Sequence, residues 1–346
     1  MTTAVDAMLR ALLEALDNVW RKTQLLSIGV LHLLFSSDSR RPRIAAGAAV
    51  RAATSTSAST VQRTYGTARL RSGTQGTELK AKKKQIIFVR HAESEWNVVF
   101  NRGVWWMAIV RFFRAVVREA LLLPTSDSIF IDSPLSRLGI RQVKALYLHV
   151  SEALTPPEDP ATAPSNLLRY LGSPVPKSIV VASNLRRAID TARIASATRL
   201  DAPGEKIHVV SYLQEIGRNI DTLALTNAYA LPSQTLSTTL QGEKEVDDLF
   251  NVSESHGNKA VLGSGRQRLY SFAQWSFCQS AEVLVVYGHS HWFRAFCQEF
   301  FPGHVFHTAK TEKLPNCGVV SLELEEQVID GKQSYAIVPE SFQFVR

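Results

Sequence analysis

The sequence predicts an α/β protein in which helices cover both faces of a mostly parallel β-sheet. Short apolar runs typical of buried strands alternate with longer segments whose apolar residues recur every three or four positions, as in helices. This alternation favours a three-layer α/β/α fold, because helical crossovers connect parallel strands. Hydrophobic residues make up 45% of the 346 residues, which is ordinary for a folded globular chain.

The individual elements follow from these two periodicities. The predicted strands share continuous apolar runs, rich in Val and Ile, that end near polar or turn-forming residues. They are 85–89, 178–182, 207–210, 282–287, 317–323 and 335–338. The predicted helices carry an apolar stripe at helical spacing. They are 136–153, 185–197, 264–279 and 290–300.

The N-terminal region differs in composition from the rest of the chain. Residues 1–37 predict a helical, amphipathic extension, because apolar residues recur at helical spacing over 4–22 and an apolar run follows over 24–35. Residues 38–84 are rich in Ser, Thr, Ala and Arg, which predicts a disordered basic linker. All predicted strands fall in 85–346, which we therefore expect to form the folded domain.

The net charge of +8 is unevenly distributed. Residues 1–84 hold 14 Lys/Arg and five Asp/Glu, whereas the remaining residues hold 25 and 26. Because the folded domain is nearly neutral, the high isoelectric point does not indicate a nucleic-acid partner. Cys278, Cys297 and Cys317 lack the spacing of metal ligands, so we expect a reducing, intracellular compartment, the cytoplasm.

Two insertions interrupt the expected domain, at 104–123 and 221–262. In the first, Arg111, Arg114 and Arg118 share one helix face, and the other faces are apolar and aromatic. This pattern is consistent with three arrangements: a helix that packs on the core, one that covers the active site, or one that lies on a membrane. The second insertion contains an acidic patch and predicts a loop-and-helix excursion at the wall or mouth of a pocket.

Two segments favour either packing on protein or contact with a membrane surface. The apolar run 24–35 is shorter than the roughly 20 residues that a membrane-spanning helix needs. Peripheral membrane or organelle association through 4–35 or 104–123 is the alternative to docking on the core or on another subunit. Acidic residues in 4–22 count against a transit peptide.

A candidate site begins where the first predicted strand ends, at Arg90 and His91. Ligands of open α/β sheets bind beyond the carboxyl ends of the strands. The guanidinium group of Arg matches phosphate oxygens, and its positive charge disfavours protonation of the neighbouring imidazole. A neutral His beside a phosphate clamp is a candidate acceptor of a phosphoryl group. The alternative is a strand end with a surface Arg, so other segments must decide.

Five segments resemble, in order, the motifs of the histidine phosphatase superfamily, also called the phosphoglycerate-mutase-like superfamily. They are Val-Arg-His-Ala-Glu-Ser-Glu-Trp-Asn (89–97), Asp-Ser-Pro-Leu-Ser-Arg-Leu-Gly-Ile-Arg-Gln (132–142), Ser-Asn-Leu-Arg-Arg-Ala-Ile-Asp-Thr-Ala (183–192), Leu-Gln-Glu (213–215) and Val-Val-Tyr-Gly-His-Ser (285–290). Ala92 replaces the usual Gly of the first motif. The resemblance implies the same three-layer fold, with one antiparallel strand in the sheet.

The resemblance also implies catalytic roles. His91 would be the nucleophile, Glu215 the general acid and base, and His289 a second histidine that donates to a phosphoryl oxygen. His291, two residues further, is a weaker candidate for that role. The His-x-His pair alone also suggests a metal, but no third ligand lies nearby in sequence. The family chemistry needs neither a metal nor an organic cofactor.

The phosphate-binding residues follow from the same motifs. Arg90 and Arg187 would hold the phosphate, and Asn97 and Ser94 would donate further hydrogen bonds or organise the loop. We expect the neighbouring Arg186 to point away, into solvent or toward the distal part of the substrate. Asp132 and Ser133 are predicted to form a turn before a helix.

The expected activity is phosphomonoester hydrolysis through a phosphohistidine, as in a histidine acid-type phosphatase. A mutase is the first alternative, but the residues after Glu215 read Ile-Gly-Arg-Asn rather than the mutase pattern. A non-catalytic phosphate-binding scaffold is the second, although binding alone requires neither a nucleophile nor an acid. The substrate is expected to be a phosphorylated small molecule, lipid or protein, and no nucleic acid is expected as a partner.

Overall fold

The protein is described from a computed structural model that covers residues 2–38, 82–155, 166–232, 246–329 and 332–346. Most of the predicted linker, 39–81, lies outside the described residues. We refer below only to the described parts of the chain.

The described strands form one eight-stranded sheet in the order β4-β3-β2-β5-β1-β6-β7, with β8 paired to β6. The strands are β1 (Lys82–Arg90), β2 (Ser178–Ser183), β3 (Ile207–Val210), β4 (Phe250–Asn251), β5 (Val283–Gly288), β6 (Val319–Ile329), β7 (Lys332–Ile337) and β8 (Gln343–Phe344). The pairs among the first five strands of this order are parallel, and all pairs of β6 are antiparallel. The predicted mostly parallel sheet with one antiparallel strand is therefore confirmed.

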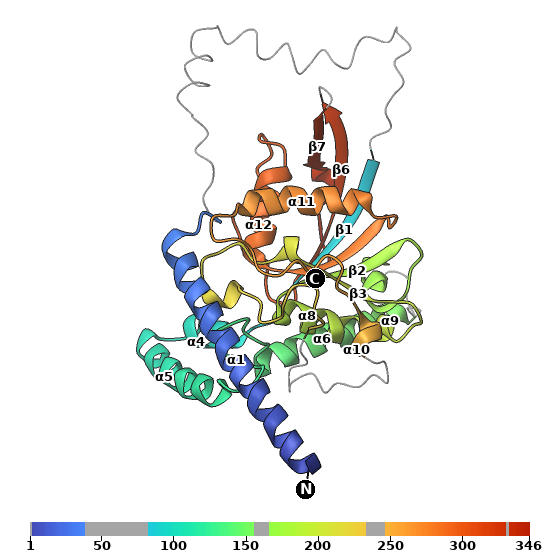
Figure 1. Ribbon diagram of the computed structural model, residues 1–346. Helices are drawn as coiled ribbons and strands as arrows, with labels where there is room; N and C mark the ends of the chain where they lie inside the picture. The colour runs from blue at the N-terminus through green and yellow to red at the C-terminus, as the bar shows by residue number, and fades with distance from the viewer. Residues whose placement is uncertain (1, 39–81, 156–165, 233–245, 330–331) are drawn as a thin grey trace, which may run out of the picture. The chain divides into compact units, whose positions relative to one another are not determined.

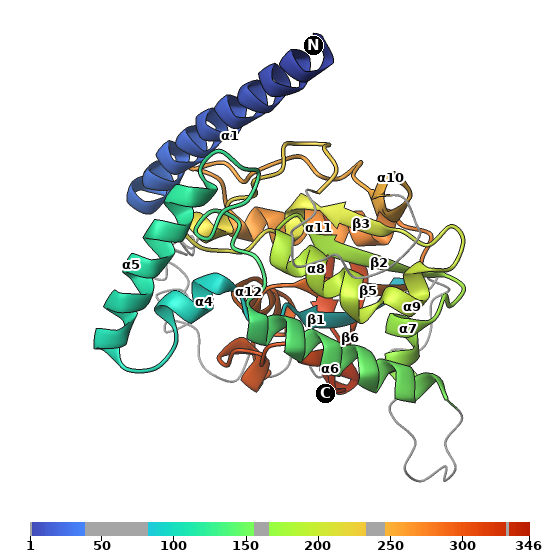
Figure 2. The same cartoon turned by 90° about the horizontal axis from the view of Figure 1, so that it is seen from below.

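Helices cover both faces of the sheet, as Figures 1 and 2 show. On one face lie α6 (Arg137–Leu154) and α8 (Arg186–Ala195), and on the other α11 (Gly265–Cys278) and α12 (Ser290–Phe300). The alternation of side chains along β1 explains the two cores: Ile86 and Phe88 pack toward α11 and α12, whereas Ile87 and Val89 pack toward α6 and α8. The predicted three-layer fold is confirmed.

Shorter helices connect these layers or cap them. They are α4 (Glu95–Phe100), α7 (Arg169–Gly172), α9 (Ala197–Leu200), α10 (Val246–Leu249) and the 3₁₀ turns Asn166–Leu168, Ser211–Leu213, Ile220–Thr222, Thr308–Lys310 and Pro339–Ser341. The insertion at 104–123 contains α5 (Trp105–Leu122). The N-terminal residues form α1 (Thr2–Phe35), one helix that includes both the amphipathic segment and the apolar run.

Two boundaries of the predicted linker were wrong. Lys82–Lys84 belong to β1, because their backbone pairs with β6 and the opposed residues Glu325 and Glu326 complement the lysine charges. Asp38 is buried, because its carboxylate is paired with Lys259 and Arg268.

The two-residue strands β4 and β8 were not predicted, since runs this short show no periodicity.

The second half of α1 packs on the domain. Leu25 lies in a small apolar cluster with Ile131 and Leu225. Gly29 permits close approach, because a Cβ atom there would lie 2.9 Å from Cγ1 of Ile220. No helix in the described part of the chain is both long enough and apolar enough to cross a membrane.

Candidate functional site

The two candidate histidines meet at the carboxyl ends of neighbouring parallel strands. Arg90, the last residue of β1, is in register with Gly288, the last residue of β5. The His91 backbone N–H donates to the Gly288 carbonyl over 3.0 Å, and the rings of His91 and His289 have centroids 5.0 Å apart. The edge of the sheet thus brings together two residues that lie almost 200 positions apart in the sequence.

His91 is held as a neutral imidazole with one defined tautomer. Its Nδ1 lies 2.6 Å from the carbonyl oxygen of Ala92. Because a carbonyl oxygen only accepts hydrogen bonds, Nδ1 carries the proton and Nε2 keeps its lone pair. Burial, followed by the charges of Arg187 and Arg90, holds the pKa of His91 well below its usual value. The sequence predicted the charge effect, and the structure adds burial as the larger cause.

His289 is buried beside it and keeps one ring nitrogen without a partner. Its Nε2 lies 2.9 Å from Oγ of Ser183, and its Nδ1 has no hydrogen bond within the described chain. Burial is the main cause that holds the pKa of His289 well below its usual value, and Arg187 and His91 add to it. A buried nitrogen without a partner is costly unless a ligand satisfies it. His289 itself is fully buried and does not line the cavity in front of His91, whereas Ser290 and His291 do. Its unpartnered Nδ1 keeps it a candidate to bind a ligand oxygen.

Arg90 and Arg187 both line the cavity in front of His91. Arg187 donates through Nη1 to the backbone carbonyl of Asp221 over 2.8 Å, and its Nη2 lies 3.5 Å from the Asp221 carboxylate. Arg90 donates through Nη1 to the carbonyl of Leu314, and its buried Nε has no partner among the described residues. Both guanidinium groups are fixed in place, which reduces the entropy lost when they bind an anion.

The predicted direction of Arg186 was wrong. Its side chain is buried, and its Nε and Nη2 donate to the carbonyls of Asp132 and Ser128, each over 2.8 Å. Its guanidinium also pairs with the carboxylate of Asp127. Asp132 in turn accepts the backbone N–H of Arg186 over 2.8 Å and that of Leu225 over 3.0 Å. Arg186 and Asp132 therefore join the segment 127–132 to the start of α8 and to Leu225.

Glu215 lines the same cavity with a buried carboxyl group. Its Oε1 accepts the backbone N–H groups of Trp292 over 2.9 Å and Ile216 over 3.0 Å. Burial raises the pKa of Glu215, although Arg187, these N–H groups and Lys259 act against that rise. A carboxyl group with a raised pKa is suited to donate a proton near neutral pH.

A buried ion pair supports the loop that carries Glu215. Lys259 Nζ donates to the backbone carbonyls of Glu215 and Gly217, each over 2.7 Å, and lies 3.0 Å from the Asp38 carboxylate. Asp38 also accepts the backbone N–H of Gly217 over 3.1 Å. The residue that ends the described N-terminal segment thus helps to hold the candidate acid in place.

Asp221 was not predicted as a site residue. It lines the cavity, pairs with Arg187 and has a carboxylate oxygen, Oδ1, that is buried without a partner in the described chain. Burial is the main cause that raises its pKa to about 6. No motif marks this residue, because only the fold brings the 221–262 insertion to Arg187. Lys313 also lines the cavity without having been predicted.

Ser94 and Asn97 line the cavity but also organise α4. Ser94 Oγ accepts the backbone N–H of Asn97 at the start of the helix, over 3.4 Å. Asn97 Oδ1 accepts a hydrogen bond from Asn101 Nδ2 over 2.9 Å. The NH₂ group of Asn97 therefore remains the candidate donor to a ligand. His291 also lines the cavity, and burial lowers its pKa to about 4.

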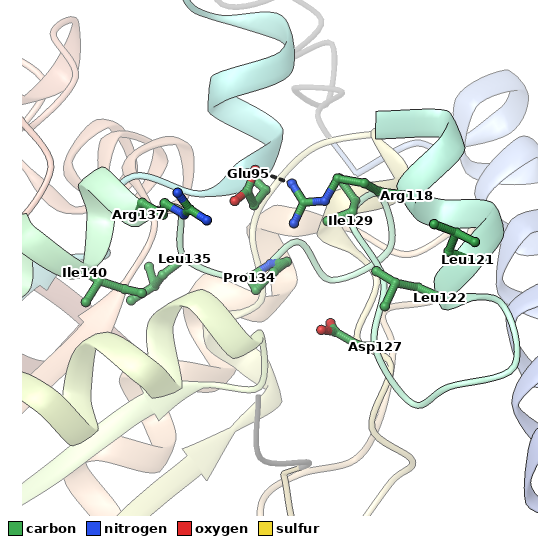
Figure 3. A pocket seen from close by; sticks show the side chains of 10 residues that line it. All are labelled: Glu95, Arg118, Leu121, Leu122, Asp127, Ile129, Pro134, Leu135, Arg137 and Ile140. Atoms are coloured by element: carbon green, nitrogen blue, oxygen red, sulfur yellow. Dashed lines mark ion pairs between the residues drawn. The ribbon is translucent and has the colours of Figure 1, made fainter. Parts of the chain in front are cut away.

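The cavity has a volume of about 140 Å³, which suits a phosphate-sized group better than a large ligand. Its lining includes no residue of 104–123, so that insertion does not roof the site. A larger cavity of about 420 Å³ lies between the end of α5 and the start of α6 (Figure 3). There Arg118 faces Glu95 across 3.5 Å, and none of the predicted catalytic residues lines it.

The loop that follows His91 requires a glycine in α6. A Cβ atom at Gly139 would lie 2.0 Å from the carbonyl oxygen of Glu93. We expect Gly139→Ala to lower the free energy of unfolding by about 2 kcal/mol or more, because a backbone atom cannot easily yield. Gly303→Ala is the matched control, since a Cβ atom there meets nothing within 4 Å. Thermal unfolding of both variants checks this, and equal melting temperatures would contradict it.

These features define a site with the requirements of phosphoryl transfer. A neutral imidazole keeps a free lone pair, two arginines are fixed beside it, and a carboxyl group with a raised pKa lies in the same cavity. Within the described chain, no group of three or more His, Cys, Asp or Glu is arranged to hold a metal ion.

Comparison with known proteins finds similar solved structures at low identity. No family model and no curated protein matches the chain. A mycobacterial glucosyl-3-phosphoglycerate phosphatase is 15% identical, over 74% of this chain and 97% of that chain, with a TM-score of 0.35. A phosphoserine phosphatase mutant from Entamoeba histolytica, solved with phosphoserine, is 12% identical over 73% and 94%, with a TM-score of 0.33.

A putative alpha-ribazole-5'-P phosphatase from Escherichia coli is 14% identical over 74% of this chain and 95% of that chain, with a TM-score of 0.34. At such identities and TM-scores, the assignment of an activity to this chain rests on its own motifs and site geometry.

Proposed function

We propose that this protein is a phosphatase of the histidine phosphatase superfamily that hydrolyses phosphomonoesters through a phosphohistidine on His91. The observation that carries the proposal is the state of His91. Its Nδ1 is held by the Ala92 carbonyl, its Nε2 keeps a lone pair, and burial beside two arginines keeps the ring neutral. A neutral, oriented imidazole is the form that attacks phosphorus.

The residues divide the reaction into two balanced steps. In the first, Nε2 of His91 forms a bond to phosphorus, the ester P–O bond breaks, and the Glu215 carboxyl group gives its proton to the leaving oxygen. In the second, the Glu215 carboxylate takes a proton from water, the water oxygen bonds to phosphorus, and the P–N bond breaks to release phosphate. Arg90, Arg187 and His289 stabilise the charge on the phosphoryl oxygens throughout.

One experiment separates this function from the two alternatives. The full chain is incubated with an aryl phosphate and, separately, with phosphoglycerates, and released phosphate and isomerised product are both measured. A phosphatase releases phosphate, whereas isomerisation without net release would indicate a mutase. Absence of both reactions, together with phosphate binding, would indicate a non-catalytic scaffold and contradict the proposal.

We expect Lys259→Met to change the pH dependence of the reaction. The charge of Lys259 lowers the pKa of Glu215, so its removal raises that pKa. Glu215 then stays protonated to higher pH, so the alkaline limb of the plot of kcat against pH shifts to higher pH. Because the loop also loses its Nζ hydrogen bonds, we expect kcat at the optimum to fall about tenfold.

Lys84→Met is the matched control for this prediction. Lys84 is also buried, and its Nζ also donates to two backbone carbonyls, those of Gln279 and Ala281. It lies near the other end of β1 from His91 and is not part of the cavity. A general loss of stability would affect both variants alike, so an unmoved alkaline limb in Lys259→Met would contradict the positioning role.

A further inference from the structure

Helix α5 presents large apolar side chains to solvent along its whole length. Ala115 is its one buried hydrophobic residue among those whose side chains are described. Nine large hydrophobic residues of the helix are exposed: Trp106, Met107, Ile109, Val110, Phe112, Phe113, Val116, Val117 and Leu121. Folded proteins rarely leave a contiguous apolar surface of this extent uncovered unless it binds something.

The first half of α1 is likewise uncovered. Every residue from 4 to 14 is exposed, and so is Leu16. The apolar stripe of Val5, Leu9, Leu12 and Leu16 is therefore not used to pack this half of the helix on the described part of the domain. Its amphipathic pattern remains without a partner within the described chain.

The two helices are fixed to the same loop and so belong to one surface. Lys22 of α1 donates through Nζ to the carbonyl of Leu122, the last residue of α5, over 2.6 Å, and also to that of Asp127. Asn18 of α1 donates to the carbonyl of Pro124 over 3.2 Å. Figures 1 and 2 both place α5 next to α1.

Positive charge lies on α5 and in the segment that follows the C-terminal end of α1, whereas the uncovered half of α1 contains Asp6, Arg10 and Glu14. Helix α5 carries Arg111, Arg114 and Arg118, and its one acidic residue is Glu119, which accepts hydrogen bonds from Ser128 and the backbone N–H of Ile129. Arg118 is paired with Glu95, and Arg111 donates to the carbonyls of Val99 and Arg102, so their charges are partly engaged within the domain. In the sequence, α1 is followed by residues 39–81, which contain eight Lys/Arg and one Asp/Glu. An apolar helix combined with a basic segment complements an anionic lipid surface, and stable binding usually requires two such signals.

We infer that α1 and α5 form a docking surface for an anionic lipid bilayer. The exposed apolar residues of α5 lie on several sides of the helix, which suits a fluid interface better than one fixed protein groove. Neither helix is apolar enough to span, so they lie in the plane of the interface. This inference does not depend on the proposed phosphatase activity.

Co-sedimentation with lipid vesicles tests the inference on the full chain. One set of vesicles contains phosphatidylcholine alone, and the other contains about one third phosphatidylserine. We expect binding to the second set, weakened by salt. The double variant Phe113→Asp, Val117→Asp removes side chains that are 64% and 61% exposed, and we expect it to weaken binding at least about tenfold.

Leu148→Asp is the matched control, because Leu148 is 61% exposed and belongs to α6 rather than to α1 or α5. It should bind vesicles as the unmodified chain does. Circular dichroism and thermal unfolding show whether each variant is folded. Absence of binding to phosphatidylserine vesicles would overturn the inference, as would an equal loss of binding in the control.

A second copy of the chain is the competing occupant of this surface. Sedimentation equilibrium without lipid decides between the two. A dimer that the Phe113→Asp, Val117→Asp variant dissociates, in a chain that does not bind vesicles, would assign the surface to self-association and overturn the inference.

Discussion

Replacement of His91 by Ala is expected to abolish hydrolysis of aryl phosphates, with kcat/KM reduced at least about a thousandfold. The loss is large because the nucleophile cannot be replaced by water at the same position, whereas the arginines would still bind the phosphate. Phosphate binding, measured by competition with an oxyanion, should therefore change much less than turnover. Rapid quenching with labelled substrate should trap an acid-labile phosphoprotein in the unmodified chain and none in His91→Ala.

His291→Ala provides the control for this prediction. Its imidazole also lines the cavity, and burial lowers its pKa to about 4, but the ring whose centroid lies 5.0 Å from that of His91 belongs to His289. We expect less than about a tenfold change in kcat/KM and an intact phosphoprotein. Hydrolysis that survives in His91→Ala would remove the nucleophile assignment, and loss of the phosphoprotein in His291→Ala would shift the second-histidine role to that residue.

The second large effect is expected from Glu215→Gln. Without the acid, a substrate with a poor leaving group, such as an alkyl phosphate, should lose about two to four orders of magnitude in kcat/KM. An aryl phosphate has a good leaving group that needs less protonation, so we expect a smaller decrease in kcat/KM for this substrate. The difference between the two substrates, measured side by side, is the signature of a general acid.

The variant Asp221→Asn tests whether the general acid is Glu215 or the neighbouring Asp221. Asp221 has a pKa of about 6 and pairs with Arg187, so above pH 6 its negative charge competes with the phosphate for the guanidinium. We expect the unmodified chain to show a KM that rises above pH 6, and Asp221→Asn to lose that rise while kcat changes little. If instead Asp221→Asn shows the leaving-group dependence and Glu215→Gln does not, the acid is Asp221.

The fold class was predicted from the sequence because its signals are local. Continuous runs of Val and Ile mark strands that are buried on both faces, and the helices between them carry apolar stripes at helical spacing. The predicted ranges 136–153 and 290–300 differ from α6 and α12 by at most one residue. The local signal fails for β4 and β8, where only the pairing partner defines the strand.

The candidate site was predicted in part, and the errors have a common cause. Arg186 and Arg187 are adjacent on α8, so their side chains differ by about 100° around the helix axis. The sequence therefore predicts that the two side chains point in different directions. It does not show that Arg186 pairs with the carboxylate of Asp127 and donates to the carbonyls of Ser128 and Asp132. Its burial follows from that long-range contact, which no local pattern reports.

The sequence by itself determined that a short apolar strand ends at Arg90 and His91, and its resemblance to the family motifs made Arg187, Glu215 and His289 candidates for the same site. Only the tertiary structure decided their chemical states. The Ala92 carbonyl fixes the His91 tautomer, burial sets the pKa of each group, and Asp38 and Lys259 support the Glu215 loop. The physical reason is that protonation and orientation depend on neighbours that the fold brings together from distant parts of the chain.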